Sequence, residues 1–291
     1  MTLVEKIKVS RYAAALFFGL ASGLTAFTHQ SAMATETDWQ ENLGGKARAI
    51  SSGPIDPETQ SVSLAIQIEL KKGWKTYWRS PGDSGIPPDF DFSKSSNLEN
   101  IEILWPAPTS FTDDYGYSVG YKDRVTLPIR VTAKSRLLPV VIDVTMRYGV
   151  CERICVPVEN QFSLVVTKSS RDNPESSALI DKAIKAVPAL TSVSGALGVT
   201  AVDHTKVASE KALLVTTKIA APSEKAELFI EGPTGWFFSL PKKISQKNAG
   251  NHVQWRISLA DLPSGTDISG KDVTFTLVNG KQAIEQIWNI D

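Results

Sequence analysis

The residues best suited to carry chemistry are the two cysteines, Cys151 and Cys155, which form a C-x3-C pair. Such a pair can be a redox-active disulfide, an inert staple, or a thiolate site for a soft metal such as Cu(I). Closing so short a loop removes only about 2 kcal/mol of unfolded-state entropy in the chain-entropy model, which is little for a chain of this length. Exchange with a partner thiol needs access to one sulfur, which a connecting loop offers. The spacing therefore favours redox chemistry, with the staple and the metal site as alternatives.

Charged residues beside the cysteines indicate how the pair would react. Arg147 and Arg153 are cations that would stabilise a thiolate, whereas Glu152 would oppose it. No helical pattern follows Cys155, so the helix dipole that lowers a thiol pKa in thioredoxin-type C-x-x-C sites has no counterpart here. We expect a pair that is attacked by a partner or passes electrons on, rather than a strong nucleophile.

Other kinds of chemistry find little support in the sequence. A zinc site normally needs four nitrogen, sulfur or oxygen ligands, and His204 and His252 belong to no such cluster. Phosphate-binding, dinucleotide-binding and serine-hydrolase motifs are missing. The 31 basic residues are balanced by 31 acidic ones, whereas a nucleic-acid binder normally carries a basic surface. We expect no metal site, no cofactor and no nucleic-acid partner.

The first 34 residues have the pattern of a secretory signal peptide. Lys6, Lys8 and Arg11 precede an apolar stretch over residues 13–27, and residues 32–34 form an A-x-A cleavage site. The alternative is an uncleaved anchor, but such a core is short for a membrane span, which needs roughly 20 residues. No other long apolar run follows, so we expect no membrane span after cleavage and a periplasmic location, where disulfides persist.

Alternating apolar residues predict that β-strands position the cysteines. Candidate strands are residues 60–70, 73–79, 100–105, 124–132, 140–148 and 161–167. The cysteine pair lies in the connection between the last two. Short strands punctuated by Pro and Gly indicate an antiparallel β-sandwich, which we assign to residues 35–168.

Residues 169–194 interrupt the strand pattern and predict a linker that contains a short helix. Apolar residues recur at helical spacing over residues 177–187, and Pro188 ends the pattern. The alternative is a helix packed within one larger domain. Strand patterns resume afterwards, so residues 195–291 are expected to form a second, smaller β-sandwich-like domain.

Aromatic residues of the 73–79 segment have two interpretations. Trp74 and Trp78 share one face of the expected strand, and Tyr77 lies on the other. They are either part of the sandwich core or an aromatic wall beside the cysteines. Asp83, in the following Pro-Gly-rich segment, is expected to be a turn residue.

Three segments resemble the N-terminal periplasmic domain of the DsbD thiol:disulfide interchange proteins and of the related ScsB proteins. They are residues 111–116 (FTDDYG), residues 121–128 (YKDRVTLP), and the Cys151–Cys155 loop with Pro157 and Glu159. The resemblance covers about residues 45–168 and implies an immunoglobulin-like sandwich. It also implies electron transfer from a membrane-embedded thiol domain to periplasmic thioredoxin-fold proteins, a chemistry linked with cytochrome c biogenesis and, for ScsB, copper tolerance.

The resemblance also assigns roles to individual residues. Cys155 would form the mixed disulfide with the partner, and Cys151 would resolve it. A cap loop would shield the sulfurs. The residues assigned to this cap are Asp113, Asp114, Tyr115 and Gly116, with Tyr117, Tyr148 and Arg153 in support.

These observations predict a periplasmic thiol–disulfide interchange protein of the protein-disulfide reductase type. It would exchange electrons with thioredoxin-like periplasmic proteins and with a separate membrane thiol donor. Two alternatives remain: a copper(I)-handling protein that uses the same cysteines, and a non-enzymatic β-sandwich module with a structural disulfide.

Overall fold

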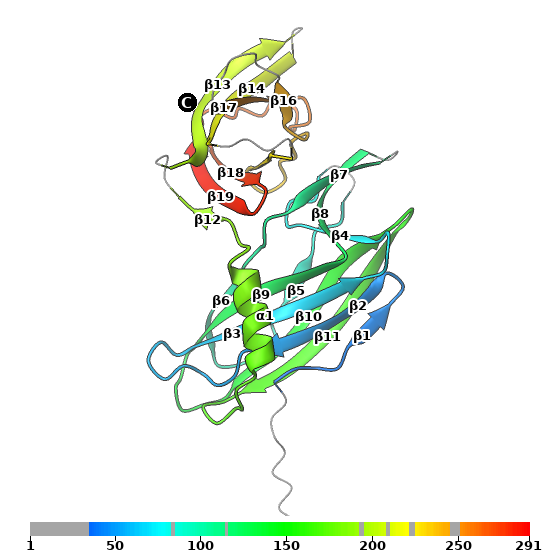
Figure 1. Cartoon of the computed structure of the whole chain (residues 1–291), viewed down its shortest axis with the longest axis vertical. Coiled ribbons are helices and arrows are strands. Elements are labelled where there is room, and N and C mark those ends of the chain that lie inside the picture. Colours follow the sequence, from blue (N-terminus) through cyan, green and yellow to red (C-terminus); the bar gives the residue numbers. More distant parts are fainter. Residues whose placement is uncertain are drawn as a thin grey trace, which may run out of the picture. The chain divides into compact units, whose positions relative to one another are not determined.

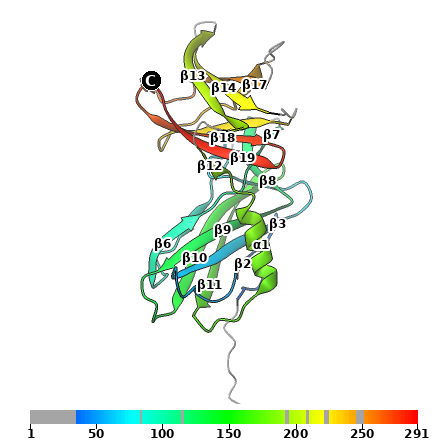
Figure 2. The same ribbon diagram turned by 60° about the vertical axis from the view of Figure 1, so that its left-hand side comes forward.

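The computed structural model describes residues 35–82, 85–113, 116–191, 195–207, 210–220, 225–244 and 251–291. The signal peptide predicted for residues 1–34 lies outside the described residues. The described residues form two β-structures and one helix (Figures 1 and 2).

The first β-structure is a sandwich of two antiparallel sheets. One sheet has, in spatial order, β1 (Gln40–Asn42), β2 (Gly45–Ser51), β3 (Ser61–Leu70), β9 (Arg124–Ala133) and β6 (Leu98–Ile103). The other has β11 (Cys155–Val166), β10 (Val140–Cys151), β4 (Lys75–Tyr77), β8 (Gly116–Lys122) and β7 (Thr109–Asp113), with β5 (Asp89–Asp91) paired to β10. The predicted all-β sandwich is confirmed.

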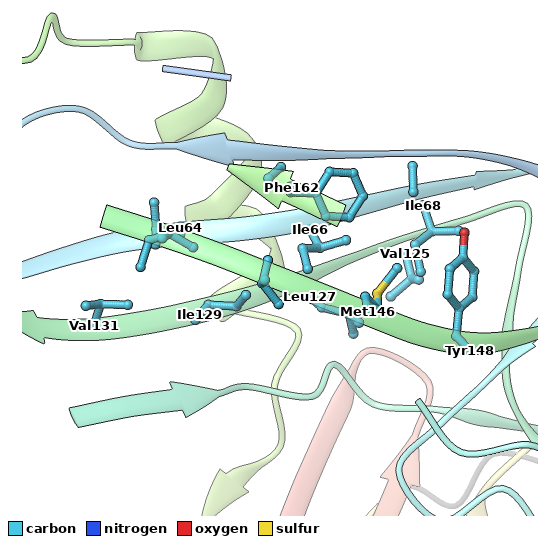
Figure 3. Packing of buried hydrophobic residues seen from close by; sticks show 14 of the residues in the cluster. Leu64, Ile66, Ile68, Val125, Leu127, Ile129, Val131, Met146, Tyr148 and Phe162 are labelled. Carbon is cyan, nitrogen blue, oxygen red and sulfur yellow. The ribbon is translucent and has the colours of Figure 1, made fainter. Parts of the chain in front are cut away.

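The core between the sheets follows directly from the alternation in the sequence. Leu64 of β3 lies opposite Ile129 of β9, and Ile66 lies opposite Leu127, so two predicted apolar faces pair with each other. Met146 of β10 reaches the same core from the other sheet (Figure 3). Because side chains alternate between faces, the remaining positions of these strands point away from this core.

The helix α1 (Pro174–Ile184) covers the outer face of the first sheet. Asn173 caps it: its side-chain oxygen accepts a hydrogen bond from the Ser176 backbone N–H at 3.0 Å. Ile180 is fully buried against Ile50 and Ala65, which are paired across β2 and β3. The predicted helix therefore exists, and it packs on the first sandwich while connecting to the second β-structure. Within the described residues, no helix has the length and apolar character to span a membrane.

The second β-structure also has two sheets. One consists of β12 (Ala189–Leu190), β19 (Gln282–Asn289), β18 (Asp272–Asn279) and β15 (Glu227–Glu231). The other consists of β13 (Leu197–Val207), β14 (Glu210–Ile219), β17 (His252–Ser258) and β16 (Lys242–Ile244). All pairs are antiparallel except β12 with β19. Val215, Trp255 and Phe275 are buried in its core, which confirms the expected second β-domain.

The second β-domain is bound to the segment that follows β4. Arg79 donates hydrogen bonds to both carboxylate oxygens of Glu231, at 2.9 and 2.7 Å, and to Glu285 at 2.5 Å. The neighbouring Trp78 packs its ring against Phe229 at a centroid distance of 5.8 Å. A bidentate arginine pair combined with an aromatic contact gives this attachment both charge and apolar area.

Shortening Ile180 to alanine should lower the free energy of unfolding by about 2–5 kcal/mol, because it leaves a cavity between α1 and the sheet. Urea denaturation of the full chain measures this change. Leu190→Ala is the control, since that side chain is 72% exposed and its removal should change stability by only about 0.5 kcal/mol. Equal effects of the two variants would show that α1 does not depend on Ile180 for its packing.

Candidate active site

The two cysteines form a disulfide at the tip of the β10–β11 hairpin. Register along the hairpin runs from Val140 opposite Val166 to Cys151 opposite Cys155, and only three residues connect the strands. The Cα atoms of the cysteines are 4.2 Å apart. The loop expected between residues 148 and 161 is therefore much shorter than predicted, because the pairing of the two strands continues to the cysteines.

The two cysteines differ sharply in their exposure to solvent. Cys151 is 2% exposed, whereas Cys155, the first residue of β11, is exposed. Attack on a disulfide requires access to one sulfur. Cys155 is therefore the more accessible of the two cysteines, and Cys151 lies inside the protein.

Tyr77 of β4 contacts both sulfurs. Its hydroxyl group donates a hydrogen bond to Cys151 Sγ at 2.6 Å and lies 3.0 Å from Cys155 Sγ. β4 is placed there by pairing with β10, and the buried Thr76 hydroxyl donates to the Gly149 carbonyl at 2.8 Å. Tyr77 is therefore a hydrogen-bond donor held next to the disulfide.

Two glycines make room for the Tyr77 ring. A Cβ atom on Gly149 would lie 2.9 Å from Tyr77 Cε2, and one on Gly85 would lie 2.8 Å from Tyr77 Cδ1. Ile86 approaches the same position of Gly149, so residues 85–86 cover the ring. Tyr77 is consequently only 2% exposed, and its hydroxyl group has little freedom to leave the sulfurs.

Two lysines and a phenylalanine share this face of the sheet. Lys75 lies directly opposite Cys151 on one side and opposite Lys122 of β8 on the other. Residues paired in this way project from the same face. The ring of Phe111, in β7, lies 4.4 Å from Lys122 Nζ and 5.9 Å from Lys75 Nζ. Lys75 thus lies between Cys151 and Lys122 on one face of the sheet.

The residues assigned to the cap loop begin at the end of β7 and reach the start of β8 along the sequence. Asp113 ends β7 and pairs with Gly116 at the start of β8. Asp114, Tyr115 and the side chain of Asp113 lie outside the described residues, so the cap stays a prediction. Tyr117 donates a hydrogen bond to the Phe238 carbonyl, which connects it to the second β-domain.

The other residues expected to support the cysteines are distributed over different environments. Tyr148 belongs to the core (Figure 3). It is three positions before Cys151 in β10, so the two side chains lie on opposite faces of the strand. Arg153 is exposed in the turn. Arg147 is engaged by Glu159 at 2.8 Å and by Asp89 at 3.3 Å, and these hydrogen bonds raise the pKa of its guanidinium group.

Sequence patterns alone did not single out Lys75, Lys122 and Phe111. Lys75 could have been found from the alternation within residues 73–79, because it is two positions from Tyr77 and the two side chains share a face of the strand. Of the two interpretations of the aromatic segment, each applies to part of it: Trp78 is core, and Tyr77 lies against the disulfide.

Comparison with known proteins places this site in a family. Residues 47–167 match the family described as "Thiol:disulfide interchange protein DsbD, N-terminal", and residues 186–291 match a domain of unknown function (DUF8393). Residues 47–167 therefore are a DsbD N-terminal domain. No curated protein sequence matches the chain.

Solved structures show the fold of the larger region. The N-terminal periplasmic domain of ScsB from Proteus mirabilis superposes with a TM-score of 0.69 at 20% sequence identity, over 88% of this chain and 98% of that chain. Both β-domains thus have a counterpart in one known structure. A marsupial T cell receptor aligns over 87% of this chain and 99% of that chain, but its TM-score of 0.22 at 10% identity is too low to indicate a shared fold.

Burial of Tyr148 predicts a loss of stability at alkaline pH. Burial raises its pKa to about 12, against a hydrogen bond from Asn42 that lowers it. The unfolded chain ionises near 10.0, so between these values unfolding releases a proton and the free energy of unfolding falls as pH rises, by about 1.4 kcal/mol per pH unit.

Tyr148→Phe should remove this part of the pH dependence. The variant also loses the hydrogen bond to Asn160, so we expect it to be less stable at pH 8 by about 1–3 kcal/mol and to lose less on going to pH 11. Urea denaturation at both pH values measures the difference. If the free energy of unfolding changes equally in the two proteins between pH 8 and pH 11, Tyr148 does not titrate in this range.

Proposed function

We propose that this chain is a periplasmic thiol:disulfide interchange protein of the protein-disulfide reductase type. The observation that carries the proposal is the hairpin-tip disulfide with one buried and one exposed cysteine and a tyrosine hydroxyl bound to both sulfurs. Its occurrence in a DsbD N-terminal domain supports the same chemistry. The proposed location rests on the N-terminal signal pattern and on the persistence of disulfides in oxidising compartments.

The proposed cycle begins with reduction of the disulfide. A thiolate of a donor protein attacks the exposed Cys155 Sγ, the S–S bond breaks, and its electron pair goes to Cys151 Sγ. Tyr77 is placed to donate a hydrogen bond to the sulfur that leaves. The donor's second thiolate then releases Cys155, so the donor becomes a disulfide and this protein becomes a dithiol.

Oxidation of the dithiol passes the two electrons on to a second protein. The Cys155 thiolate attacks the disulfide of a thioredoxin-fold partner and forms a mixed disulfide. Cys151 then attacks Cys155 Sγ, which releases the partner as a dithiol and restores the Cys151–Cys155 bond. The donor we propose is a separate membrane protein with a thiol pair, and the cycle needs no diffusible cofactor.

Trapping variants test the assignment of the two cysteines. Cys151→Ser leaves the exposed Cys155 without its resolving partner, so it should accumulate mixed disulfides with thioredoxin-fold proteins in the periplasm of a Gram-negative host. Cys155→Ser leaves only the buried Cys151 thiol, so it should accumulate several-fold less of these mixed disulfides. Non-reducing gels and mass spectrometry of the adducts measure both. Equal yields of mixed disulfide from the two variants would contradict the assignment of the two cysteines. The reduction potential of the unsubstituted protein tests the redox role itself, because a value below about −300 mV would place the bond among structural disulfides.

Removing the Tyr77 hydroxyl should slow reduction of the disulfide. A hydrogen bond to a charged group contributes about 1.5–3 kcal/mol, so Tyr77→Phe should lower the second-order rate with dithiothreitol by about tenfold or more. Tyr148→Phe is the matched control, because that hydroxyl lies in the core on the other face of β10. An unchanged rate in Tyr77→Phe would show that the contact is structural.

A further inference from the structure

A cavity of about 360 Å³ lies beside α1, away from the disulfide. It is lined by residues of α1, of the facing strands β3 and β9, and of the segment that precedes β7. The Ala107 backbone N–H donates a hydrogen bond to the Ala186 carbonyl at 2.8 Å, which holds that segment against the residues after α1. Small-molecule sites in proteins have volumes of about 300–1,000 Å³, so the cavity is large enough for a small ligand.

Small side chains on the helix leave this space. Ile180 is fully buried and fills the contact between α1 and the sheet at its own level. The next residues on this side that line the cavity are Ala183 and Ala186, whose side chains end at Cβ. Together with Leu179 and Pro106 they give the cavity an apolar wall.

The polar floor of the cavity contains a buried donor. Gln67 of β3 is only 8% exposed, and its side-chain oxygen accepts a hydrogen bond from Arg48 Nε at 2.8 Å. Its amide nitrogen makes no hydrogen bond within the described part of the chain. Thr126 lies directly opposite Gln67 in the β3–β9 pair and adds a hydroxyl group to the lining. Buried amide groups normally have partners for their donors, so this floor is suited to a ligand that brings an acceptor.

Two cations border the same cavity. Arg124 of β9 and Lys182 of α1 belong to its lining, and both are exposed at its mouth. Neither forms an ion pair within the described residues. Glu69 is the acidic residue among the described lining, and its carboxylate is paired with Lys46 at 3.3 Å. The lining therefore combines positive charge and hydrogen-bond donors on one side with an apolar wall on the other.

We propose that this cavity binds a small aliphatic carboxylate. The carboxylate accepts a hydrogen bond from the Gln67 amide and pairs with Arg124 and Lys182, and the aliphatic part lies against Leu179 and Ala183. A hydrophilic anion such as phosphate would leave the apolar wall uncovered, and a hydrocarbon would leave the Gln67 amide without an acceptor. A carboxylate with an aliphatic body satisfies both sides.

Calorimetric titration of the protein with sodium octanoate tests the proposal, and we expect saturable binding at one site. Ala183→Leu fills the cavity and should weaken this binding by at least about tenfold, because the added side chain occupies the space of the ligand. Ala178→Leu is the matched control, since Ala178 is exposed on α1 and does not line the cavity. Equal affinities of the two variants for octanoate would overturn the proposal.

Variants without the cations test whether the site selects the carboxylate. Arg124→Gln combined with Lys182→Gln should weaken octanoate binding by about threefold or more and leave the affinity for octan-1-ol unchanged. Lys185→Gln removes an exposed lysine that does not line the cavity, so it should bind octanoate like the unsubstituted protein. An unchanged affinity of the double variant for octanoate would contradict the assignment of the carboxylate site.

Amide NMR signals of the unsubstituted protein decide the case if Ala183→Leu does not fold. Octanoate should shift the signals of Gln67, Thr126 and Ala183 in a saturable way and leave those of β14 and β17, in the second β-domain, unchanged. Shifts that do not saturate, or that fall only outside the cavity lining, would overturn the proposal. None of these measurements involves the disulfide, so their outcome is independent of the proposed redox function.

Discussion

The register of β10 is the constraint on which the whole site depends. Val150 points into the core, so Gly149 and Cys151 must point to the opposite face. A slip of one residue would bury the polar side of the strand, which the apolar alternation of β10 prevents. The same register places Cys151 opposite both Cys155 and Lys75. The hydrophobic core thus determines where the sulfurs lie and what surrounds them.

Close packing then converts this position into a defined chemical environment. Gly149 and Gly85 leave just enough space for the Tyr77 ring, and residues 85–86 cover it, so the hydroxyl group remains beside the sulfurs. Cys155 is exposed and Cys151 is buried, so the two cysteines differ in their access to solvent. This difference supports the proposed exchange, in which a partner attacks Cys155.

The second β-domain is attached through residues that adjoin the site. Arg79 follows β4 closely and is bound by Glu231 and Glu285. Tyr117 of β8 is bound by the Phe238 carbonyl. Strand β8 and the segment that follows β4 therefore make contacts outside the DsbD N-terminal domain. This arrangement gives the second domain a physical connection to the strands that carry Tyr77 and Lys122.

The sequence by itself determined the all-β class, the apolar faces of β3 and β9, and the importance of Cys151 and Cys155. These features are local, because alternation and cysteine spacing can be read along the chain. Only the tertiary structure decided that Tyr77 contacts the sulfurs and that Lys75 lies opposite Cys151. Both depend on β4, a strand of three residues whose partners β8 and β10 are distant in sequence. Pairing between distant strands is set by how both sheets close around the core, which local periodicity does not encode.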